Sequence, residues 1–326
     1  MAEGLNLSRI DAIRNVPSLD ALYQEAAKLN MRPGWVRSDT PILWKEAKSK
    51  IGPSHWRYEE CKAALDAAGR LIDVSLAERR NFGLREAMPG NDISTTRTLV
   101  CAYQMILPGE NAPSHRHTPH ALRVIIDAKG SYSVVDGEKT PMETGDVVLT
   151  PGWSWHEHGH DGDEPGYWFD GLDVPLVQLL EPMFYEEHPD RFEKKVRAVT
   201  SSPFRFPRDE MARQLDKVKA DPEGFHGPRI ELPAPTMPTM GLSMERLPSG
   251  TKTRPQRSTA NRCFVAVEGS GETVVEGKRA AWRPGDVFTA PCWTRYEHHA
   301  TSDALVFEMT DEPLMRFAKY YRFQAD

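Results

Sequence analysis

Six of the eleven histidines of this chain fall between residues 115 and 160, and their spacing is that of a metal site. His115 and His117 are two residues apart, so in an extended strand their side chains point to the same face. His156 opens a second cluster and shares its parity with His158. Three neutral imidazoles on adjacent strands would bind a divalent transition metal from one side and leave its other positions open. We therefore expect His115, His117 and His156 to be metal ligands.

Two further side chains share these faces and could act on a substrate. If the strand that carries His115 and His117 continues, Arg123 lies on their face, where its guanidinium could bind a carboxylate through two parallel hydrogen bonds. The alternative is a partly buried structural arginine paired with an Asp or Glu. His158 lies two residues after His156, where it could donate to a bound substrate and transfer protons.

Other aromatic and imidazole side chains of this region are expected to serve the fold. Trp153 and Trp155 have the opposite parity from His156, so we expect them to pack in the core. His120 and His160 fall near the expected strand ends, where we expect them to be exposed. These four residues are therefore left out of the candidate site.

The composition is that of a globular protein with room for two domains of ordinary size. Of 326 residues, 39% are hydrophobic and 27% are charged, and the net charge of −6 favours neither a nucleic-acid partner nor an acidic membrane surface. No run of about eighteen apolar residues predicts a membrane span, and the first residues lack the apolar stretch of a secretory signal. The four cysteines are scattered, as expected for reduced thiols, so we expect a cytoplasmic protein.

Residues 1–74 are predicted to form a helical extension. Apolar residues recur at helical spacing over 19–29, with Ser18 as the N-cap, and a second helix is expected over 56–72. These helices are expected to cover a barrel or a subunit interface, and to take no part in the chemistry.

The rest of the chain is predicted to form two barrels joined by a linker. Residues 75–180 alternate short strands with turns, including a tight hairpin at Val135–Glu138. Residues 181–238 are predicted to be a linker with helices, because the stretches 186–199 and 208–224 are charged and favour helix. Residues 239–326 are predicted to be the second barrel.

The second barrel repeats the first without its metal ligands. Residues 256–271 align with residues 115–130, and GDVFTAPCWTRYEHH aligns with GDVVLTPGWSWHEHG after a one-residue deletion. In this alignment the three expected ligands are replaced by Gln256, Ser258 and Tyr296. An amide, a hydroxyl and a phenol make a poor site for a transition metal. We therefore expect one metal ion per chain, in the N-terminal barrel.

These motifs resemble the cupin superfamily and, more closely, the gentisate and salicylate 1,2-dioxygenases, which are ring-cleaving enzymes. The resemblance rests on APSHRHTPHALR, GDVVLTPGWSWHEHG and WFDGLDVPLV, with AERRNFGLRE upstream and GDVFTAPCWTRYEH downstream. It implies an all-β dominated bicupin fold, in which two jelly-roll β-barrels carry an N-terminal helical extension and a helical inter-barrel linker. It also implies Fe(II) as the metal, although three imidazoles alone would admit Zn, Mn, Ni or Cu. A homo-oligomer, a tetramer, is implied as well.

The resemblance further implies a substrate and a reaction. A 2-hydroxybenzoate would bind the iron through its carboxylate and phenolate oxygens. O2 would then split the bond between the carboxyl-bearing and hydroxyl-bearing carbons, with Arg123 and His158 as catalytic residues that also contact the substrate.

Four other residues match the family's substrate site. Arg79 would be a second cation for the carboxylate, or else a solvated turn residue, and Gln104 could hydrogen-bond the substrate. Asp170 could orient a pocket histidine or arginine, or be a structural carboxylate with its own partners. Asn81 occupies a position where the pocket wall varies.

Several functions stay open at this point. The ring could be that of gentisate, salicylate or a 5-substituted salicylate such as 5-nitrosalicylate, and a wider pocket would accept 1-hydroxy-2-naphthoate. A cupin that binds a metal or an aromatic acid without turnover is the alternative from another class, because cupins host many functions. A zinc isomerase or hydrolase is a further alternative.

Overall fold

The computed structural model describes residues 7–35, 42–73, 76–77 and 79–325. The chain forms two compact units, Met1–Ala47 and Lys48–Asp326. The expected boundary at residues 74 and 75 lies outside the described residues. No helix in the described part of the chain is long and apolar enough to span a membrane.

The first unit contains two short helices, α1 (Leu7–Arg14) and α2 (Leu19–Lys28). Ser18 caps α2 as expected, since its hydroxyl accepts a hydrogen bond of 3.2 Å from the Ala21 amide. The helix α1 was not expected from the sequence. Its few apolar residues do not form a stripe, and no residue of α1 is buried.

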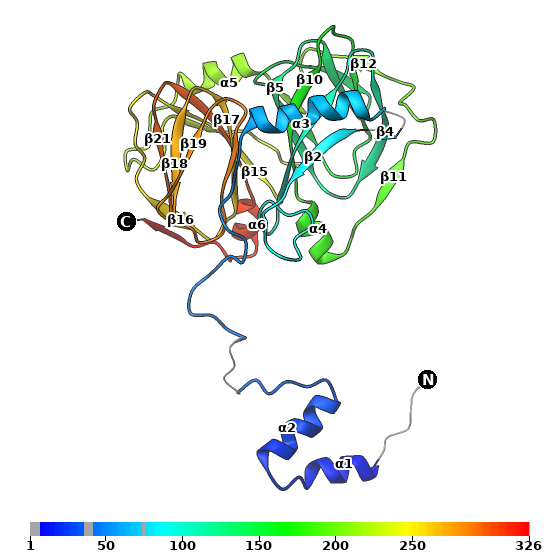
Figure 1. The fold of residues 1–326 in the computed structure, drawn as a ribbon, viewed down its shortest axis with the longest axis vertical. Helices are drawn as coiled ribbons and strands as arrows, with labels where there is room; N and C mark the ends of the chain where they lie inside the picture. The colour runs from blue at the N-terminus through cyan, green and yellow to red at the C-terminus, as the bar shows by residue number, and fades with distance from the viewer. Residues whose placement is uncertain (1–6, 36–41, 74–75, 78, 326) are drawn as a thin grey trace. The chain divides into compact units, whose positions relative to one another are not determined.

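The first barrel of the second unit consists of two six-stranded sheets that face each other (Figure 1). One sheet has the order β13 (Arg205–Phe206), β8 (Val147–Thr150), β5 (Ala121–Asp127), β10 (Gly166–Leu172), β3 (Val100–Ile106) and β2 (Arg80–Leu84). The other has the order β11 (Tyr185–Glu187), β4 (Asn111–His117), β9 (His156–His160), β6 (Ser131–Val135), β7 (Glu138–Met142) and β12 (Arg197–Ala198).

The second barrel repeats this plan. Its larger sheet has the order β1 (His55–Trp56), β20 (Val287–Ala290), β17 (Arg262–Glu268), β22 (Ala304–Thr310), β15 (Gly241–Leu247) and β14 (Arg229–Glu231). Its smaller sheet has the order β19 (Lys278–Trp282), β18 (Gly271–Val275), β21 (Tyr296–Ala300), β16 (Gln256–Ser258) and β23 (Phe323–Ala325). The equivalent strands of the two barrels pair in the same order. The all-β dominated bicupin architecture expected from the sequence is therefore confirmed.

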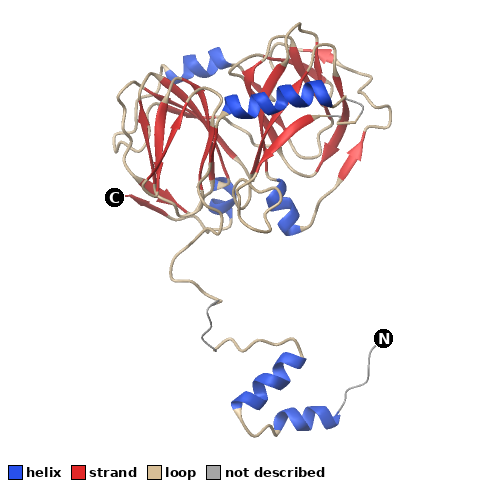
Figure 2. Ribbon diagram, in the orientation of Figure 1, coloured by secondary structure: helices blue, strands red, loops and turns tan. Residues whose placement is uncertain are grey.

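The helices are few, and they lie on the outside of the β-sheets (Figure 2). In this unit they are α3 (Tyr58–Leu71), α4 (Val174–Leu180), α5 (Arg208–Leu215) and α6 (Glu312–Phe317). The helix expected over 56–72 is thus confirmed. So is the hairpin at Val135–Glu138, where Asp136 and Gly137 both have positive φ, 47° and 79°.

The largest apolar core lies between the two barrels. The outer faces of β3, β5, β8 and β10 pack against those of β15, β17, β20 and β22, with fully buried residues such as Leu122, Phe169, Val287 and Phe307. Each barrel also has a smaller apolar cluster in its own interior. In each barrel, one face of the sheet that contains these strands is used for this contact. The opposite face of that sheet is therefore the one available for a site inside the barrel.

Two helices begin on the aspartates of the repeated Gly-Asp turns. The amide of Tyr58, the first residue of α3, donates to Asp286 Oδ1 at 2.8 Å, and the amide of Arg208, the first residue of α5, donates to Asp146 Oδ1 at 2.9 Å. The glycine before each aspartate has a φ of 89° and no room for a Cβ atom beside the helix. The sequence repeat GDV is therefore explained by helix docking.

Two threonine–aspartate hydrogen bonds, one buried and one partly buried, connect the two halves of the chain. Thr98 Oγ1 donates to Asp311 Oδ2 at 2.6 Å, and Thr239 Oγ1 donates to Asp173 Oδ2 at 2.6 Å. Each threonine precedes the first long strand of one barrel, and each aspartate follows the last long strand of the other. The contact is the same in both directions because the chain is an internal repeat.

The predicted linker is only partly helical. The segment 208–224 contains α5, but the segment 186–199, expected to favour helix, instead contributes to β11 and β12. These short strands pair with the open edges of β4 and β7, so the backbone groups of both partners are satisfied by the sheet. The charged composition of this segment reflects its exposure and not a helix.

A buried ion cluster fills the interior of the second barrel. Arg262 contacts both Glu308 and Glu312, and Arg229 lies 3.4 Å from Glu308. The Arg262 and Glu308 side chains are each 5% exposed. The two arginines lower the pKa of Glu308 to about 2, although burial alone would raise it.

This cluster predicts a pH-dependent stability. A carboxyl whose pKa is lower in the folded chain stabilises it above about pH 4.5, and this contribution is lost as the pH falls toward 2. We expect Glu308→Gln to lose less unfolding free energy between pH 5 and pH 3 than the unmodified chain, as measured by urea unfolding. The control Glu231→Gln, which alters an exposed partner of Arg229, should keep the normal pH dependence. An unchanged pH dependence in Glu308→Gln would contradict the assignment.

Candidate metal centre

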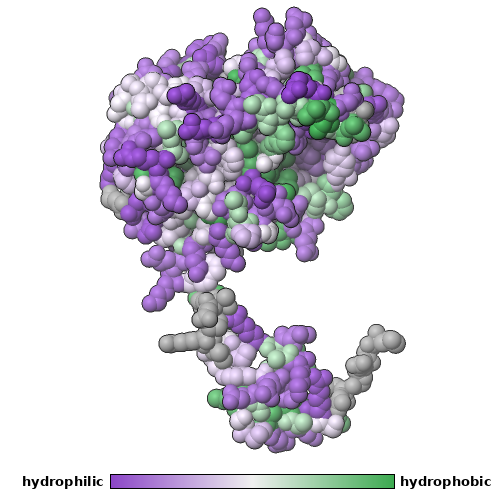
Figure 3. Space-filling view, viewed as in Figure 1, coloured by the Kyte–Doolittle hydropathy of each residue, from purple (hydrophilic) through white to green (hydrophobic). Residues whose placement is uncertain are grey.

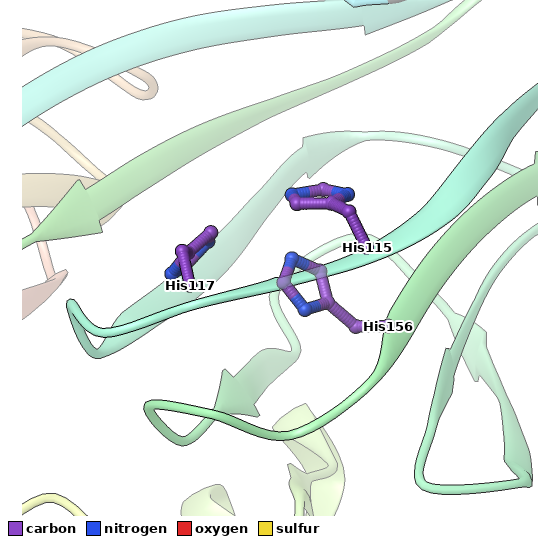
Figure 4. A group of neighbouring side chains, drawn as sticks. All are labelled: His115, His117 and His156. Carbon is purple, nitrogen blue, oxygen red and sulfur yellow. The ribbon is translucent and has the colours of Figure 1, made fainter. Parts of the chain in front are cut away.

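Three imidazoles meet inside the first barrel where β4 pairs with β9. His115 lies directly opposite His156, and a bulge between Ala112 and His115 resets the register just before this pair. His117 follows on the same face of β4. Figure 4 shows the three side chains directed toward one another. One ligand nitrogen from each lies within 4.8 Å of the other two, so the three can bind one metal ion.

Backbone carbonyls orient two of the three rings. His117 Nδ1 lies 2.8 Å from the Pro119 carbonyl oxygen, and His156 Nδ1 lies 3.0 Å from the Ser154 carbonyl oxygen. A carbonyl only accepts, so each Nδ1 carries the proton and each Nε2 keeps a lone pair for a metal. This is the usual outer arrangement of a histidine metal ligand.

The environment keeps these imidazoles neutral. Burial lowers the pKa of His115 to about 2, with Arg79 adding to the effect, and burial lowers the pKa of His117 to about 4. The pKa of His156 is lowered well below its usual value by burial and by the other two histidines. Neutral imidazole is the form that binds metal. The donor set and its surroundings therefore fit a divalent transition metal.

The third ring has a different partner. Arg79 Nη2 donates to His115 Nδ1 at 2.6 Å and to the Pro113 carbonyl oxygen at 2.8 Å. The sequence left Arg79 open between a site residue and a solvated turn, and the structure places it at the metal centre. A donor on Nδ1 requires that Nδ1 be unprotonated, whereas a His115 that binds metal through Nε2 would carry the proton on Nδ1. His115 Nδ1 also lies 3.4 Å from the Pro113 carbonyl oxygen, which can accept that proton.

Arg123 reaches the interior from the opposite sheet. The chain turns after His117, so the expected continuous strand is wrong, and Arg123 lies on β5 instead. Its Nη1 donates to Thr150 Oγ1 at 2.6 Å, and its Nε lies 3.3 Å from Asp170 Oδ1, directly across from it in the register. The expected common interior is still present, because two facing sheets replace one long strand.

Asp170 and Arg123 form a buried pair. Burial raises the pKa of the Asp170 carboxyl to about 6, against the attraction of Arg123 and Arg79, and burial lowers the pKa of Arg123. Gln104 lies on the same face of this sheet, is 4% exposed, and is flanked in the register by Trp168 and Asn81. Asn81 itself is exposed on the edge strand β2. The structure thus brings Arg123, Asp170 and Gln104 to one inner face, with Asn81 at its rim.

His158 is buried on β9 and faces the same interior. Its ring lies 6.0 Å from that of His156 and 5.9 Å from that of Trp168, measured between centroids. Burial lowers its pKa well below the usual value, and Arg123 adds to the effect.

The comparisons with known proteins agree with this geometry. A family model for the cupin domain matches residues 102–174. The chain is 32% identical to gentisate 1,2-dioxygenase 1 of Aquipseudomonas alcaligenes, over 92% of this chain and 94% of the relative. It is 34% identical to 5-aminosalicylate 1,2-dioxygenase of Comamonas sp, over 94% of this chain and 90% of the relative. A solved variant of salicylate 1,2-dioxygenase from Pseudoaminobacter salicylatoxidans, in complex with gentisate, superposes with a TM-score of 0.87 at 27% identity, covering 96% of both chains.

This chain belongs to the gentisate and salicylate 1,2-dioxygenase family. It is an aromatic ring-cleavage dioxygenase with a bicupin fold. In the described part of this dioxygenase, no second group of His, Cys, Asp and Glu side chains is placed to hold a metal ion. In the second barrel, the counterparts of His115 and His117 make other contacts. Gln256 donates to the Phe225 carbonyl oxygen at 3.1 Å, and Arg262 donates to Ser258 Oγ at 3.3 Å.

Trp153 and Trp155 of the dioxygenase do not pack in the core, although the sequence predicted that they would. Trp153 is 43% exposed, and Arg116 lies over the rings of both Trp153 and Trp155, 4.5 and 4.4 Å from their centroids. Parity correctly placed them on the face opposite the ligands. On that face the Trp155 ring also contacts the ring of His188, and the Trp153 ring contacts that of Phe184, so the two tryptophans pack at the surface of the barrel.

The two histidines expected to be exposed have structural roles. His160 is 1% exposed, between Ser131 Oγ and the Glu164 carbonyl oxygen, so this expectation was wrong. His120 is half-buried, and its Nδ1 accepts from the Gly152 amide at 2.8 Å. In the second barrel Asn261 is the counterpart of His120, and its Oδ1 accepts from the Cys292 amide at 3.1 Å. An asparagine can therefore replace the histidine at this position.

The sequence analysis did not predict the ion pair between Arg80 and Glu110, which fixes the backbone next to Arg79. The neighbouring Arg80 forms two hydrogen bonds to Glu110, of 2.6 and 2.8 Å, and one of 2.8 Å to the Ile72 carbonyl oxygen. This pair fastens the start of β2 to the turn before β4. The adjacent arginines in AERR were the available signal, but only the structure shows that they point to different partners.

The ligand assignment predicts the behaviour of two histidine variants. We expect His117→Ala to lose metal binding, because only two of the three imidazoles remain. The variant should stay folded, because the removed ring is only partly buried. The matched control His120→Asn should keep its metal, since Asn261 makes the equivalent bond in the second barrel. Metal content by mass spectrometry and circular dichroism would check both. Full metal occupancy in His117→Ala would contradict the assignment.

Proposed function

We propose that this ring-cleaving dioxygenase uses Fe(II) and splits the C1–C2 bond of a 2-hydroxybenzoate, with both oxygen atoms of O2 entering the product. The substrate class is gentisate, salicylate or a 5-substituted salicylate such as 5-nitrosalicylate. The observation that carries the proposal is the three-histidine centre with Arg123 held in the same interior by Thr150 and Asp170. The names of the relatives, which act on gentisate and on an aminosalicylate, support this class.

The metal would be held by His115, His117 and His156. Bound there, Fe(II) would supply open positions for the substrate and for O2 and a path for electrons between them. The histidines contribute neutral, pre-oriented rings.

Two arginines would bind the substrate carboxylate. Arg123 is buried and already oriented by two partners, so little side-chain entropy remains to be lost on binding. Arg79, now on His115, lies close enough to the centre to act as a second cation. A substrate carboxylate that draws Arg79 away from His115 would free Nδ1 of that ring. A protonated Nδ1 could then donate to the Pro113 carbonyl oxygen.

The other candidate residues would act on the phenol and on the ring. His158, whose ring lies 6.0 Å from that of His156, would accept the phenol proton when the substrate binds through its oxygens. Asp170 would keep Arg123 in place, and Gln104 would donate a hydrogen bond to the substrate. Asn81, at the rim, would lie nearest to the ring substituent.

We also propose a homo-oligomer, with a tetramer as the expected state. Hydrophobic side chains gather where α3 ends (Figure 3), and Leu71 and Leu76 are exposed there by 76% and 83%. In the first unit Leu7, Trp35 and Leu43 are exposed as well. Light scattering after gel filtration would test the state, and a monomer would contradict it.

Three other functions are tested by the same preparation. A wider pocket would show as turnover of 1-hydroxy-2-naphthoate, and a cupin that only binds a metal or an aromatic acid would show binding without oxygen uptake. A zinc isomerase or hydrolase would bind zinc on purification and be active without O2. The family relationship favours the oxygenase.

The decisive assay is oxygen consumption after anaerobic loading with Fe(II). We expect rapid uptake with one of gentisate, salicylate, 5-nitrosalicylate and 5-chlorosalicylate, matched one to one by loss of the ring absorbance. 1-Hydroxy-2-naphthoate is included as the wider substrate. No uptake with any of these acids, in protein confirmed to hold iron, would contradict the proposed function.

The role of Arg123 predicts a change in KM. We expect Arg123→Ala to keep its metal and to raise KM for the aromatic acid by on the order of a hundredfold, because a buried charge-assisted bond of about 2–3 kcal/mol is lost. The control Arg116→Ala removes an equal charge from the opposite face of β4, and its KM should stay within about twofold. An unchanged KM in Arg123→Ala would remove this residue from the carboxylate site.

A further inference from the structure

His158 is a buried polar side chain whose ring nitrogens have no hydrogen-bond partner among the described residues. It is 1% exposed, and neither Nδ1 nor Nε2 is bonded. Leaving a buried polar group unpaired costs about 1–3 kcal/mol, and most such groups in folded proteins have a partner. A bound substrate can satisfy one nitrogen. A side chain of the protein can provide the partner for the other.

Ser133 is the residue placed to be that partner. It lies directly opposite His158 in the pairing of β6 with β9, and it is fully buried. Side chains directly opposite in an antiparallel pair have Cβ atoms about 4.5–5.5 Å apart, within reach of a hydroxyl–imidazole bond. The Ser133 hydroxyl proton is directed to the Glu157 carbonyl oxygen at 3.5 Å. Its oxygen therefore keeps lone pairs that can accept.

Two equivalent pairs in the same chain already place a hydroxyl against Nδ1 of the opposite histidine. Ser131 lies opposite His160 one step along the same strands, and its Oγ is 2.8 Å from His160 Nδ1. In this pair the hydroxyl donates, because His160 carries its proton on Nε2, which faces the Glu164 carbonyl oxygen. Thr273 lies opposite His298 at the matching position of the second barrel, and its Oγ1 is 2.8 Å from His298 Nδ1. In both pairs the hydroxyl contacts Nδ1, the ring nitrogen nearer the backbone. The Ser133–His158 pair has the same register and the same residue types.

The Ser133 hydroxyl determines which nitrogen of His158 carries the proton. Because Ser133 gives its own proton to the Glu157 carbonyl oxygen, it can only accept from His158, unlike Ser131 in its pair. A bond between the two side chains therefore places the His158 proton on Nδ1.

We propose that Ser133 is a positioning residue for His158: Ser133 Oγ accepts the Nδ1 proton and leaves the Nε2 lone pair directed at the metal centre. This proposal rests on the proposed function, in which the substrate phenol must lose its proton as it binds. The phenol O–H bond breaks, an N–H bond forms at Nε2, and the phenolate keeps the electron pair. Ring opening adds two oxygen atoms and no proton, so the same proton returns to the product.

The proposal is tested by Ser133→Ala, Ser133→Thr and the matched control Ser131→Ala. We expect Ser133→Ala to lower kcat by on the order of tenfold, the range of lost outer-shell contacts, with KM changed less than about twofold. Ser133→Thr should restore kcat, because Thr273 makes this bond in the second barrel. Ser131→Ala removes a buried hydroxyl bonded to a histidine outside the site, so it controls for any loss of stability and should keep kcat.

A second readout does not depend on turnover. In Zn(II)-loaded protein with 15N-labelled histidine, long-range N–H correlation spectra should show His158 as the Nδ1–H tautomer, with a detectable Nε2–H fraction in Ser133→Ala. An Nε2–H tautomer in the unmodified chain, or an unchanged tautomer and kcat in Ser133→Ala, would overturn the proposal. If Ser133→Ala does not fold, Ser133→Cys preserves the volume with a weaker acceptor. Absence of turnover in the unmodified chain would count against the proposed function, whereas the tautomer would still decide the role of Ser133.

Discussion

The pairing of β4 with β9 is the constraint on which the rest of the site depends. It sets His115 opposite His156, and the bulge in β4 resets the register just before this pair. Once three imidazoles and an arginine are buried in one interior, every remaining polar group there needs a partner, because water is excluded. Local carbonyls provide this for His117 and His156, and Thr150 and Asp170 provide it for Arg123. Preorganisation of this kind is what a metal centre and an anionic substrate require.

The internal repeat shows which parts of the barrel belong to the fold and which to the chemistry. Both barrels keep the strand order, the Gly-Asp turn that begins a helix and the cross-barrel threonine–aspartate bond. They differ in the interior. In the first, Asp170 lies opposite Arg123, whereas in the second the equivalent Glu308 lies opposite Phe264 and is neutralised by Arg262 and Arg229. The second barrel thus holds a buried ion cluster, whereas the first holds the three-histidine cluster. The larger sheet of the second barrel packs against the first barrel through the shared apolar core.

Much of this could be predicted from the sequence because it depends on local spacing. The two-residue interval of His115 and His117 is a property of a single strand, and the structure brings these two rings together with His156, as the sequence predicted. The replacement of the three histidines in the repeat is visible in the aligned residues themselves. Arg123 reached the predicted face by a different route, since a turn after His117 is invisible to a parity argument. The charged segment 186–199 was predicted to favour helix because its composition does not show that an open sheet edge lies beside it. Ser133 was not singled out because its partner is 25 residues away and the register is a tertiary property.

The most direct test of the central claim is to follow both atoms of 18O2 into the product of the Fe(II)-loaded enzyme, with the ring-opened acid analysed by mass spectrometry. A single metal centre that cleaves the ring between the carboxyl-bearing and hydroxyl-bearing carbons predicts that the product gains both labelled atoms, with one O2 consumed per ring. Incorporation of one labelled atom into a product with an intact ring, with the other atom of O2 reduced to water by an added reductant, would indicate a hydroxylase and contradict the account.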